Sequence, residues 1–434
     1  MDLSVLVPPA HGAEIDAIVL DARTKGMPPG SPPLRLGEIG RQGWNLLRGD
    51  LPLPAAVLHI DRLRQNSRWM AEFLRLNDLV IAPHGKTTMT PQLFALQLHD
   101  GAWAMTVGTV QQLAVAHHFG VKRVLMANQP IERVAIDACY AHLRDDPGFE
   151  LYVLADSLAG VEMLAAGARR AGANRAIDVL LEIGYPGGRT GCRDLETALA
   201  VAEVIARTPG LRLAGVENFE GLLKNPADVD AFLERYGEIV AQVAARGLFR
   251  REGPIVLTAG GSAFFDRVAR RLASIKLPGQ VLRVIRSGCY IAHDQMGYEQ
   301  QYRRIKAAGE LRLPSHDLLP ALEVWAYVQS RPDPTKAIVT MGRRDIGTDA
   351  GWPVPCLWFR PGKMAKPEPL GPGHAIEGLN DQHGHLAIPA ASHLAVGDML
   401  AFGMGHPCTT FDKWQVMMLV NPDYDIVGAV RTYF

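Results

Sequence analysis

The sequence predicts a protein of the α/β class, a (β/α)₈ barrel followed by a second, mainly β domain. Short apolar runs of strand length alternate with amphipathic stretches as far as residue 285. After about Tyr298 the long amphipathic stretches stop, strand-like runs continue, and Pro and Gly become frequent. Alternation of this kind is typical of parallel βαβ units, and eight of them in about 230 residues suit a closed barrel. A doubly wound open sheet is the structural alternative.

The elements of the barrel follow an extended segment at residues 52–60. Asp61 is a plausible N-cap for a helix over Arg62–Leu76. Eight strands are expected at Leu79–Ala82, Ala104–Val107, Arg123–Ala127, Leu151–Ala155, Ile177–Ile183, Leu213–Val216, Ile255–Thr258 and Leu282–Ile285. Helices are expected between them at Gln111–Phe119, Ile131–Leu143, Leu158–Arg170, Leu195–Ala206 and Val229–Ala245.

The domain boundaries follow from this pattern. Residues 1–50 are weakly patterned and are expected to form an N-terminal extension that packs with the β domain. Residues 51–300 are assigned to the barrel, and residues 301–434 to the β domain. Strands of the β domain are expected at Ala321–Gln329, Lys336–Met341, His385–Ile388, Met399–Phe402, Gln415–Val420 and Ile426–Tyr433.

The composition excludes several classes of function. Lys plus Arg and Asp plus Glu are equal at 45 each in 434 residues, which leaves no basic field for nucleic acid. No apolar run reaches the roughly 18 residues that cross a bilayer, and the first residues lack the pattern of a signal peptide. Five cysteines, an odd number in a long chain, do not form a disulfide framework, so a reducing cytoplasm is the expected location.

A lysine follows the first expected strand, in the sequence Ala82-Pro83-His84-Gly85-Lys86-Thr87-Thr88. In a (β/α)₈ barrel, reactive groups lie on the loops at the carboxyl ends of the strands. A lysine held there is expected to be partly desolvated, which lowers its pKa and favours the neutral amine that condenses with an aldehyde. From this stretch alone, a solvated lysine in a βα loop is the favoured interpretation, and the segments that follow along the chain reverse that preference.

Two glycine-bearing turns follow the seventh and eighth strands, where such barrels commonly hold phosphate. They contain Gly260 and Gly261 in the first turn, and Gly288, Cys289 and Tyr290 in the second. Bare backbone N–H groups can cradle a phosphate, although each turn alone is also read as a plain turn. Arg189 follows the fifth strand. A lysine, an arginine and a phosphate site around one barrel mouth suit pyridoxal phosphate, with the arginine facing the pyridine nitrogen.

Pro83-His84-Gly85-Lys86-Thr87, with residues 52–66 before it, resembles the fold-type III pyridoxal phosphate enzymes related to alanine racemase. Within them the chain is similar to the D-serine dehydratase and D-threonine aldolase group. The resemblance implies that Lys86 is the Schiff-base lysine and that Arg189 faces the pyridine ring. It also implies a phosphate site formed by Gly260, Gly261, Gly288 and Cys289, with Tyr290 in a glycine-X-tyrosine turn.

Three positions depart from the family pattern. Ala82 and Thr88 stand where the family often has a basic residue and a histidine. Phe219 replaces a usual tyrosine, so this side chain is expected to pack on the cofactor ring without donating a hydrogen bond. These changes bear on the substrate more than on the cofactor.

A possible metal site lies near the C-terminus, at His406-Pro407-Cys408. Imidazole and thiolate at this spacing suit zinc, although a plain β-turn fits the spacing equally well. The resemblance implies zinc on His406 and Cys408, with the other positions left to water and substrate. In a family-like segment at residues 380–385, His383 is expected to orient the substrate or water, the alternative being an exposed polar loop.

The resemblance implies that the protein is a lyase. Its expected substrates are small-molecule D-3-hydroxy amino acids, and its expected cofactors are pyridoxal phosphate and Zn²⁺. The first hypothesis is a dehydratase that converts a D-serine-like substrate to a keto acid and ammonia, with Lys86 as the base. The second is an aldolase of the D-threonine type, which by resemblance pairs with His-X-Asp rather than His-X-Cys. A non-catalytic carrier of pyridoxal phosphate is the alternative of another class. A homodimer is implied, with neither nucleic acid nor membrane as partner.

Overall fold

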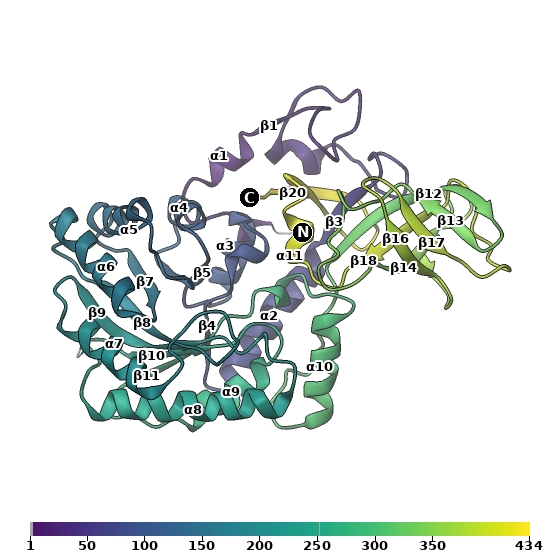
Figure 1. Ribbon diagram of the computed structural model, residues 1–434. Helices are drawn as coiled ribbons and strands as arrows, with labels where there is room; N and C mark the ends of the chain where they lie inside the picture. Colours follow the sequence, from purple (N-terminus) through teal and green to yellow (C-terminus); the bar gives the residue numbers. More distant parts are fainter. Residues whose placement is uncertain (1–2, 251) are drawn as a thin grey trace.

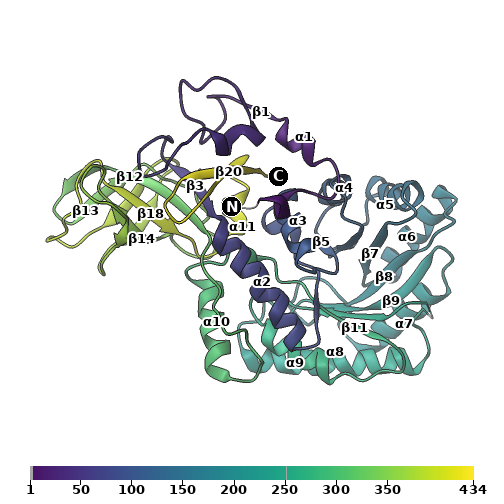
Figure 2. The ribbon, with the colours of Figure 1, turned by 180° about the vertical axis from the view of Figure 1, so that it is seen from behind.

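The computed structural model describes residues 3–250 and 252–434, and it contains a parallel barrel beside a mainly antiparallel sheet (Figures 1 and 2). The fold class expected from the sequence is therefore confirmed. The eight parallel strands, in hydrogen-bonded order, are β4 (Val80–Ile81), β11 (Val281–Ile285), β10 (Ile255–Ala259), β9 (Leu211–Asn218), β8 (Ile177–Ile183), β7 (Glu150–Ala155), β6 (Arg123–Met126) and β5 (Met105–Val107).

Two backbone hydrogen bonds close this sheet between its first and last strands. The Trp103 N–H donates to the Ile81 carbonyl, and the Thr106 N–H donates to the Pro83 carbonyl, both at 2.8 Å. The interior is filled by side chains from all eight strand segments: Ala82, Ala104, Leu125, Tyr152, Leu154, Leu180, Ala214, Val256 and Val284. The open-sheet alternative is excluded by this closure, and the carboxyl ends of all eight strands meet at one rim.

Helices cover the outside of the barrel, and most of them join one of its strands to the next. They are α2 (Ile60–Leu76), α3 (Pro91–His99), α4 (Val110–His118), α5 (Arg133–Asp145), α6 (Leu158–Ala171), α7 (Leu195–Arg207), α8 (Pro226–Ala245), α9 (Phe265–Ser274) and α10 (Gly297–Ala308). Short 3₁₀ turns at Gly85–Thr87 (η3) and Cys289–Ile291 (η4) follow β4 and β11. No helix among the described residues is both long and apolar enough to cross a membrane.

The first of these helices begins earlier than expected. Helix α2 starts at Ile60 with His59 at the N-cap position, and no side chain caps it. The prediction of Asp61 as the N-cap is wrong, because the chain turns directly from strand β3 (Ala55–His59) into the helix. Asp61 lies in the first turn instead, where its negative charge suits the positive end of the helix dipole.

The antiparallel sheet contains β12 (Leu322–Asp333), β13 (Lys336–Val339), β14 (Val354–Phe359), β15 (Glu368–Pro369), β16 (Ala375–Leu379), β17 (Gly384–Ala387), β18 (Met399–Gly403), β19 (Val416–Val420) and β20 (Ile426–Arg431). Strand β3 also belongs here, since it pairs antiparallel with β12 and parallel with β19. The boundary expected at residue 51 assigned this strand to the barrel, whereas its hydrogen bonds join it to the second sheet. The chain thus crosses between the two parts twice.

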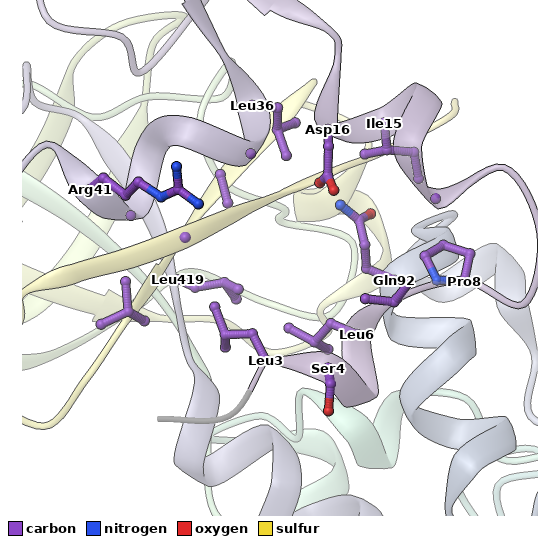
Figure 3. Close-up of a pocket in the computed structure, with 17 residues that line it drawn as sticks. Leu3, Ser4, Leu6, Pro8, Ile15, Asp16, Leu36, Arg41, Gln92 and Leu419 are labelled. Atoms are coloured by element: carbon purple, nitrogen blue, oxygen red, sulfur yellow. The ribbon is translucent and has the colours of Figure 1, made fainter.

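The N-terminal extension lies over β19 and β20. It contains η1 (Ser4–Leu6), α1 (Gly12–Asp16), β1 (Val19–Leu20), β2 (Leu34–Arg35) and η2 (Leu36–Arg41). A cavity of about 370 Å³ remains between the extension and these strands, with Leu36 and Leu419 in its lining (Figure 3). Asp16 and Arg41 are its charged lining side chains, and its described lining includes neither a lysine nor a cysteine. This cavity therefore lacks the groups that the sequence proposes for catalysis.

Candidate active site

A different cavity, of about 400 Å³, opens at the carboxyl rim of the barrel and extends to the β domain. The barrel contributes Lys86 on η3, Phe219 after β9, Gly261 after β10, and Gly288 and Cys289 after β11. The β domain contributes His406 and Cys408, from the loop after β18 and the start of helix α11 (Cys408–Phe411). Seven of the residues proposed from the sequence are therefore brought to one cavity from segments that are far apart in the chain.

Lys86 lies in the mouth of this cavity, and its side chain is exposed. The expectation that burial desolvates this lysine is wrong, because the rim around η3 is open to solvent. Lys86 lines this cavity together with Gly261 and Gly288, one from each of the two glycine-bearing turns.

Arg189 adjoins the site through Phe219. Its guanidinium lies over the Phe219 ring, 5.0 Å from the ring centroid. The two residues also line a small neighbouring cavity with Glu182. A cation–π contact of this kind holds the arginine against the Phe219 side chain, which lines the larger cavity.

Besides Arg189, three proposed residues do not reach the cavity lining. The Gly260 N–H donates a hydrogen bond to the Glu220 carboxylate at 3.0 Å, so this donor is already used. The Tyr290 hydroxyl lies in the core and accepts a hydrogen bond from Gln97 at 3.1 Å, which gives Tyr290 a packing role. His383 lies exposed in the turn between β16 and β17, outside the lining formed by its own chain.

The sequence motifs did not indicate a role for several residues that line the cavity. His84 and Arg286 both line it. The Arg286 guanidinium donates to the Thr258 hydroxyl at 2.9 Å and to the Asn218 carbonyl at 3.0 Å, and it forms a buried ion pair with Glu217. The position of Arg286, just before the Ser287-Gly288 turn, is a signal that could have identified it from the sequence.

Three cationic side chains lie around the site: Lys86 and Arg286 line the cavity together with the Asp294 carboxylate, and Arg189 lies beside it. Burial lowers the pKa of His84 well below its ordinary range, and the positive charges of Lys86, Arg286 and Arg189 lower it further. His84 is therefore neutral at physiological pH, and the cationic character of the site comes from the lysine and the two arginines. Such a surface attracts anions such as phosphate and carboxylate.

Buried polar atoms without partners surround the same rim. Among the described residues, Nδ1 of His84, both amide atoms of Asn218 and one carboxylate oxygen of Glu217 lack a hydrogen-bond partner. Burial raises the pKa of Glu217 to about 8, although its ion pair with Arg286 opposes this. Polar atoms left unsatisfied inside a protein are costly and call for a bound group.

A glycine is required at position 288 by close packing. A Cβ added there would lie 2.5 Å from the Thr87 hydroxyl and 2.6 Å from the His84 carbonyl oxygen. The turn after β11 can therefore approach the lysine-bearing turn only because residue 288 has no side chain. The cations, the unpaired polar atoms and this glycine cradle together fit pyridoxal phosphate.

The metal-ligand pair proposed from the sequence proves to be part of a triad. The ligand atoms of Cys289, His406 and Cys408 all lie within 4.8 Å of one another. The two sulfurs are 3.7 Å apart, and the Cys289 sulfur is 3.8 Å from Nδ1 of His406. The hydrogen bond between the two sulfurs lowers the pKa of Cys408 and raises that of Cys289, so Cys408 is the more readily ionised of the two. Thiolate and imidazole are donors that suit zinc.

Comparison with known proteins shows which fold the chain has. Residues 321–420 match the family model described as a putative serine dehydratase domain. Solved structures with a similar fold include D-threonine aldolase from Filomicrobium marinum, with a TM-score of 0.72, 22% identity, and coverage of 90% of this chain and 97% of the other. Alanine racemase of Clostridium difficile 630 matches with a TM-score of 0.60 at 12% identity, over 88% and 99%. The fold is that of alanine racemase.

Sequence relatives identify which enzymes of the alanine racemase fold this chain resembles. D-threo-3-hydroxyaspartate dehydratase from Delftia sp. (strain HT23) is 27% identical over 399 residues, 88% of this chain and 97% of the relative. A structure of that dehydratase, a cysteine-to-alanine variant in the metal-free form, has a TM-score of 0.67 at 23% identity and covers 90% and 99%. 3-Hydroxy-D-aspartate aldolase of Paracoccus denitrificans (strain Pd 1222) is 25% identical over 315 residues, 70% and 75%. The resemblance to the D-serine dehydratase and D-threonine aldolase group is thereby confirmed, and the named relatives are lyases, as the sequence predicted.

Proposed function

We propose that the protein is a dehydratase that uses pyridoxal phosphate and zinc to convert a D-3-hydroxy amino acid into a keto acid and ammonia. The observation that carries this proposal is a single cavity lined both by the Lys86 side chain and by a cysteine–histidine triad. A base near Cα and a Lewis acid near the β-oxygen are the two groups that β-elimination of a hydroxyl requires. The relatives, which are named for D-hydroxy amino acid substrates, support the same class.

The cofactors would supply the electronic part of the reaction. Bound pyridoxal phosphate would withdraw electrons from Cα, and a zinc ion would polarise the β-oxygen. Gly261 and Gly288 would hold the phosphate end, while Phe219 and Arg189 would face the ring. His406 and Cys408 would hold the metal.

Lys86 performs the proton transfer in this proposal. Its amine takes the proton from Cα, the Cβ–O bond breaks, and the oxygen leaves as hydroxide with the bonding electron pair. The double bond forms between Cα and Cβ, and hydrolysis of the released enamine gives the keto acid and ammonia. The neutral His84 and the fixed Arg286 line the same wall, where they orient the anionic groups of the substrate.

Aldol cleavage by the same cavity is the second candidate, because relatives of both kinds match the chain. In that reaction a base takes the β-hydroxyl proton and the Cα–Cβ bond breaks. The presence of cysteine rather than aspartate at position 408 favours elimination by resemblance to the dehydratases.

D-threonine and D-threo-3-hydroxyaspartate separate these reactions, with the L-enantiomers as controls. With the protein loaded with pyridoxal phosphate and zinc, we expect 2-oxobutanoate or oxaloacetate together with ammonia. Glycine with acetaldehyde or glyoxylate would support the aldolase instead. A protein that binds the cofactor and turns over no hydroxy amino acid would favour the carrier hypothesis.

Removal of the metal tests the role assigned to zinc. We expect EDTA to abolish turnover while the visible absorbance of bound pyridoxal phosphate persists, and added Zn²⁺ to restore turnover. The metal assignment is wrong if turnover is the same in EDTA as in zinc.

A homodimer is also part of the proposal, and it gives His383 a place. This residue is exposed in the β16–β17 turn of its own chain. In a dimer that faces the β domain of one chain toward the barrel of the other, His383 would act across the interface. Light scattering of the loaded protein measures the mass. A monomer with full turnover would exclude this role.

A further inference from the structure

We infer that Cys289 is a third protein ligand of the metal, so that this chain holds its cation through two cysteine sulfurs and one histidine nitrogen. The inference deepens the proposed function and rests on the metal site that the function requires. From the sequence, Cys289 was assigned only to the phosphate turn, through its backbone N–H. The thiol is a separate group that points away from that role toward His406 and Cys408.

The distances match a tetrahedral site. Bonds of about 2.3 Å to sulfur and about 2.05 Å to nitrogen, at tetrahedral angles, place two ligand sulfurs about 3.8 Å apart and a sulfur and a nitrogen about 3.6 Å apart. The observed separations are 3.7 Å between the two sulfurs and 3.8 Å between the Cys289 sulfur and Nδ1 of His406. Two of the three separations thus lie within about 0.2 Å of the tetrahedral values, and the third, between His406 and Cys408, is within 4.8 Å.

Three protein ligands leave one open position. Structural zinc sites are closed by four protein ligands, whereas catalytic sites have three and leave the fourth to water or substrate. The open side of this triad faces the cavity, because all three residues line it together with Lys86. The third ligand therefore makes the ion more firmly held without blocking the position that a substrate oxygen needs.

The third ligand also joins the two parts of the molecule. Cys289 begins η4 after the last barrel strand, while His406 and Cys408 come from the β domain. Metal bound by all three would cross-link these parts, and its binding free energy would add to the stability of their contact. A two-ligand site on His406 and Cys408 would lie within the β domain alone.

The same geometry has an explanation without a cation, in which the two thiols form a hydrogen bond. The separation of 3.7 Å excludes a disulfide, whose sulfurs lie about 2.05 Å apart. Hydrogen bonds account for each contact of the Cys289 sulfur taken singly, to Cys408 and to Nδ1 of His406. Three donor atoms within 4.8 Å of one another also match the ligand set of a single ion. The convergence of three donors on one side of the cavity favours a cation.

Cobalt substitution of the full chain counts the sulfur ligands directly. Thiolate-to-cobalt charge-transfer absorbance grows with the number of thiolates bound, so we expect C289S to show about half the intensity per cobalt of the unchanged protein. Loss of an outer-shell partner already costs 10–100-fold in metal affinity, so loss of a direct ligand should raise the Kd for Zn²⁺ by about 100-fold or more. Cys356→Ser, in β14 and outside the cavity, is the matched control and should change neither quantity.

A second variant, C289D, separates loss of the ligand from misfolding of C289S. C289D keeps an anionic ligand at the position, so it should bind Zn²⁺ more tightly than C289S, and zinc should raise its Tm more. Equal charge-transfer intensity in C289S and the unchanged protein would overturn the inference while leaving a two-ligand site and the proposed function in place. Full intensity without turnover of any hydroxy amino acid would uphold the third ligand and reject the proposed function.

Discussion

The Cys408 sulfur lies 3.5 Å from the Thr87 hydroxyl, although the two residues are 321 positions apart in the chain. Thr87 directly follows Lys86 on η3, and Cys408 belongs to the cluster that it forms with Cys289 and His406. This contact sets the cluster beside the lysine. Any change in how the β domain packs on the barrel would change the spacing between the lysine and the cluster, so the proposed site depends on this interface.

Replacement of the lysine tests the base. Lys86→Ala should abolish the visible absorbance of bound pyridoxal phosphate and lower kcat by about 10³-fold or more, because both covalent attachment and the proton acceptor are lost. Absorbance spectra and keto acid formation measure the two effects. Lys224→Ala, at an exposed loop position after β9, is the control and should change neither. Normal absorbance in the Lys86 variant would reject the central assignment.

Exchange of a ligand tests the choice between elimination and cleavage. Cys408→Asp keeps an anionic donor at the metal but replaces sulfur by oxygen. We expect metal binding to weaken and the ratio of acetaldehyde to 2-oxobutanoate from D-threonine to rise. The argument from the His-X-Cys pair is undercut if the product ratio stays the same while the metal remains bound.

The cradle formed by Gly288 is testable through cofactor affinity. A Cβ at this position would lie 2.5 Å from the Thr87 hydroxyl and 2.6 Å from a backbone oxygen, so Gly288→Ala should push the phosphate turn away from η3. We expect the Kd for pyridoxal phosphate to rise by about tenfold or more, measured by fluorescence titration. Gly371→Ala, where an added Cβ meets nothing within 4 Å, is the control. An unchanged Kd in Gly288→Ala would show that the turn does not hold the phosphate.

Glu323 on β12 makes the free energy of unfolding depend on pH, because it is paired with His59 and Arg62 where β3 meets α2. Burial alone would raise its pKa, but His59 at 3.0 Å and Arg62 at 3.1 Å outweigh burial, and the pKa falls to about 2 from an ordinary 4.5. Because the pKa in the folded state is the lower one, the stabilisation is present above pH 4.5 and is lost as the pH falls from 4.5 toward 2.

Glu323→Gln should therefore remove part of the acid sensitivity. We expect the variant to lose about 3 kcal/mol of stability at neutral pH, because His59 and Arg62 keep their places without the carboxylate. Urea unfolding at several pH values measures both effects. Glu377→Gln, exposed on β16, is the control. A pH dependence equal to that of the unchanged protein would contradict the assignment.

The sequence by itself determined the order and the type of the elements. All eight barrel strands lie where the apolar runs predicted them, because a strand buried on both faces must be a short, nearly continuous apolar run. It also determined which side chains follow the strand ends, and so it placed Lys86, Gly261 and Gly288 at one rim. Local signals carried all of this information.

The features that depend on contacts between distant segments were decided by the tertiary structure alone. They are the pairing of β3, the exposure of individual side chains and the cysteine cluster. Strand β3 gives no sign in its sequence that it pairs with β12 and β19, since an extended apolar segment fits either sheet. The exposure of Lys86 and the burial of Tyr290 depend on how neighbouring loops close over them. Cys289 and Cys408 are separated by 119 positions, and their sulfurs meet because the β domain folds back onto the barrel rim. Spacing along a chain predicts ligands that share one turn, whereas a ligand from another domain follows from packing alone.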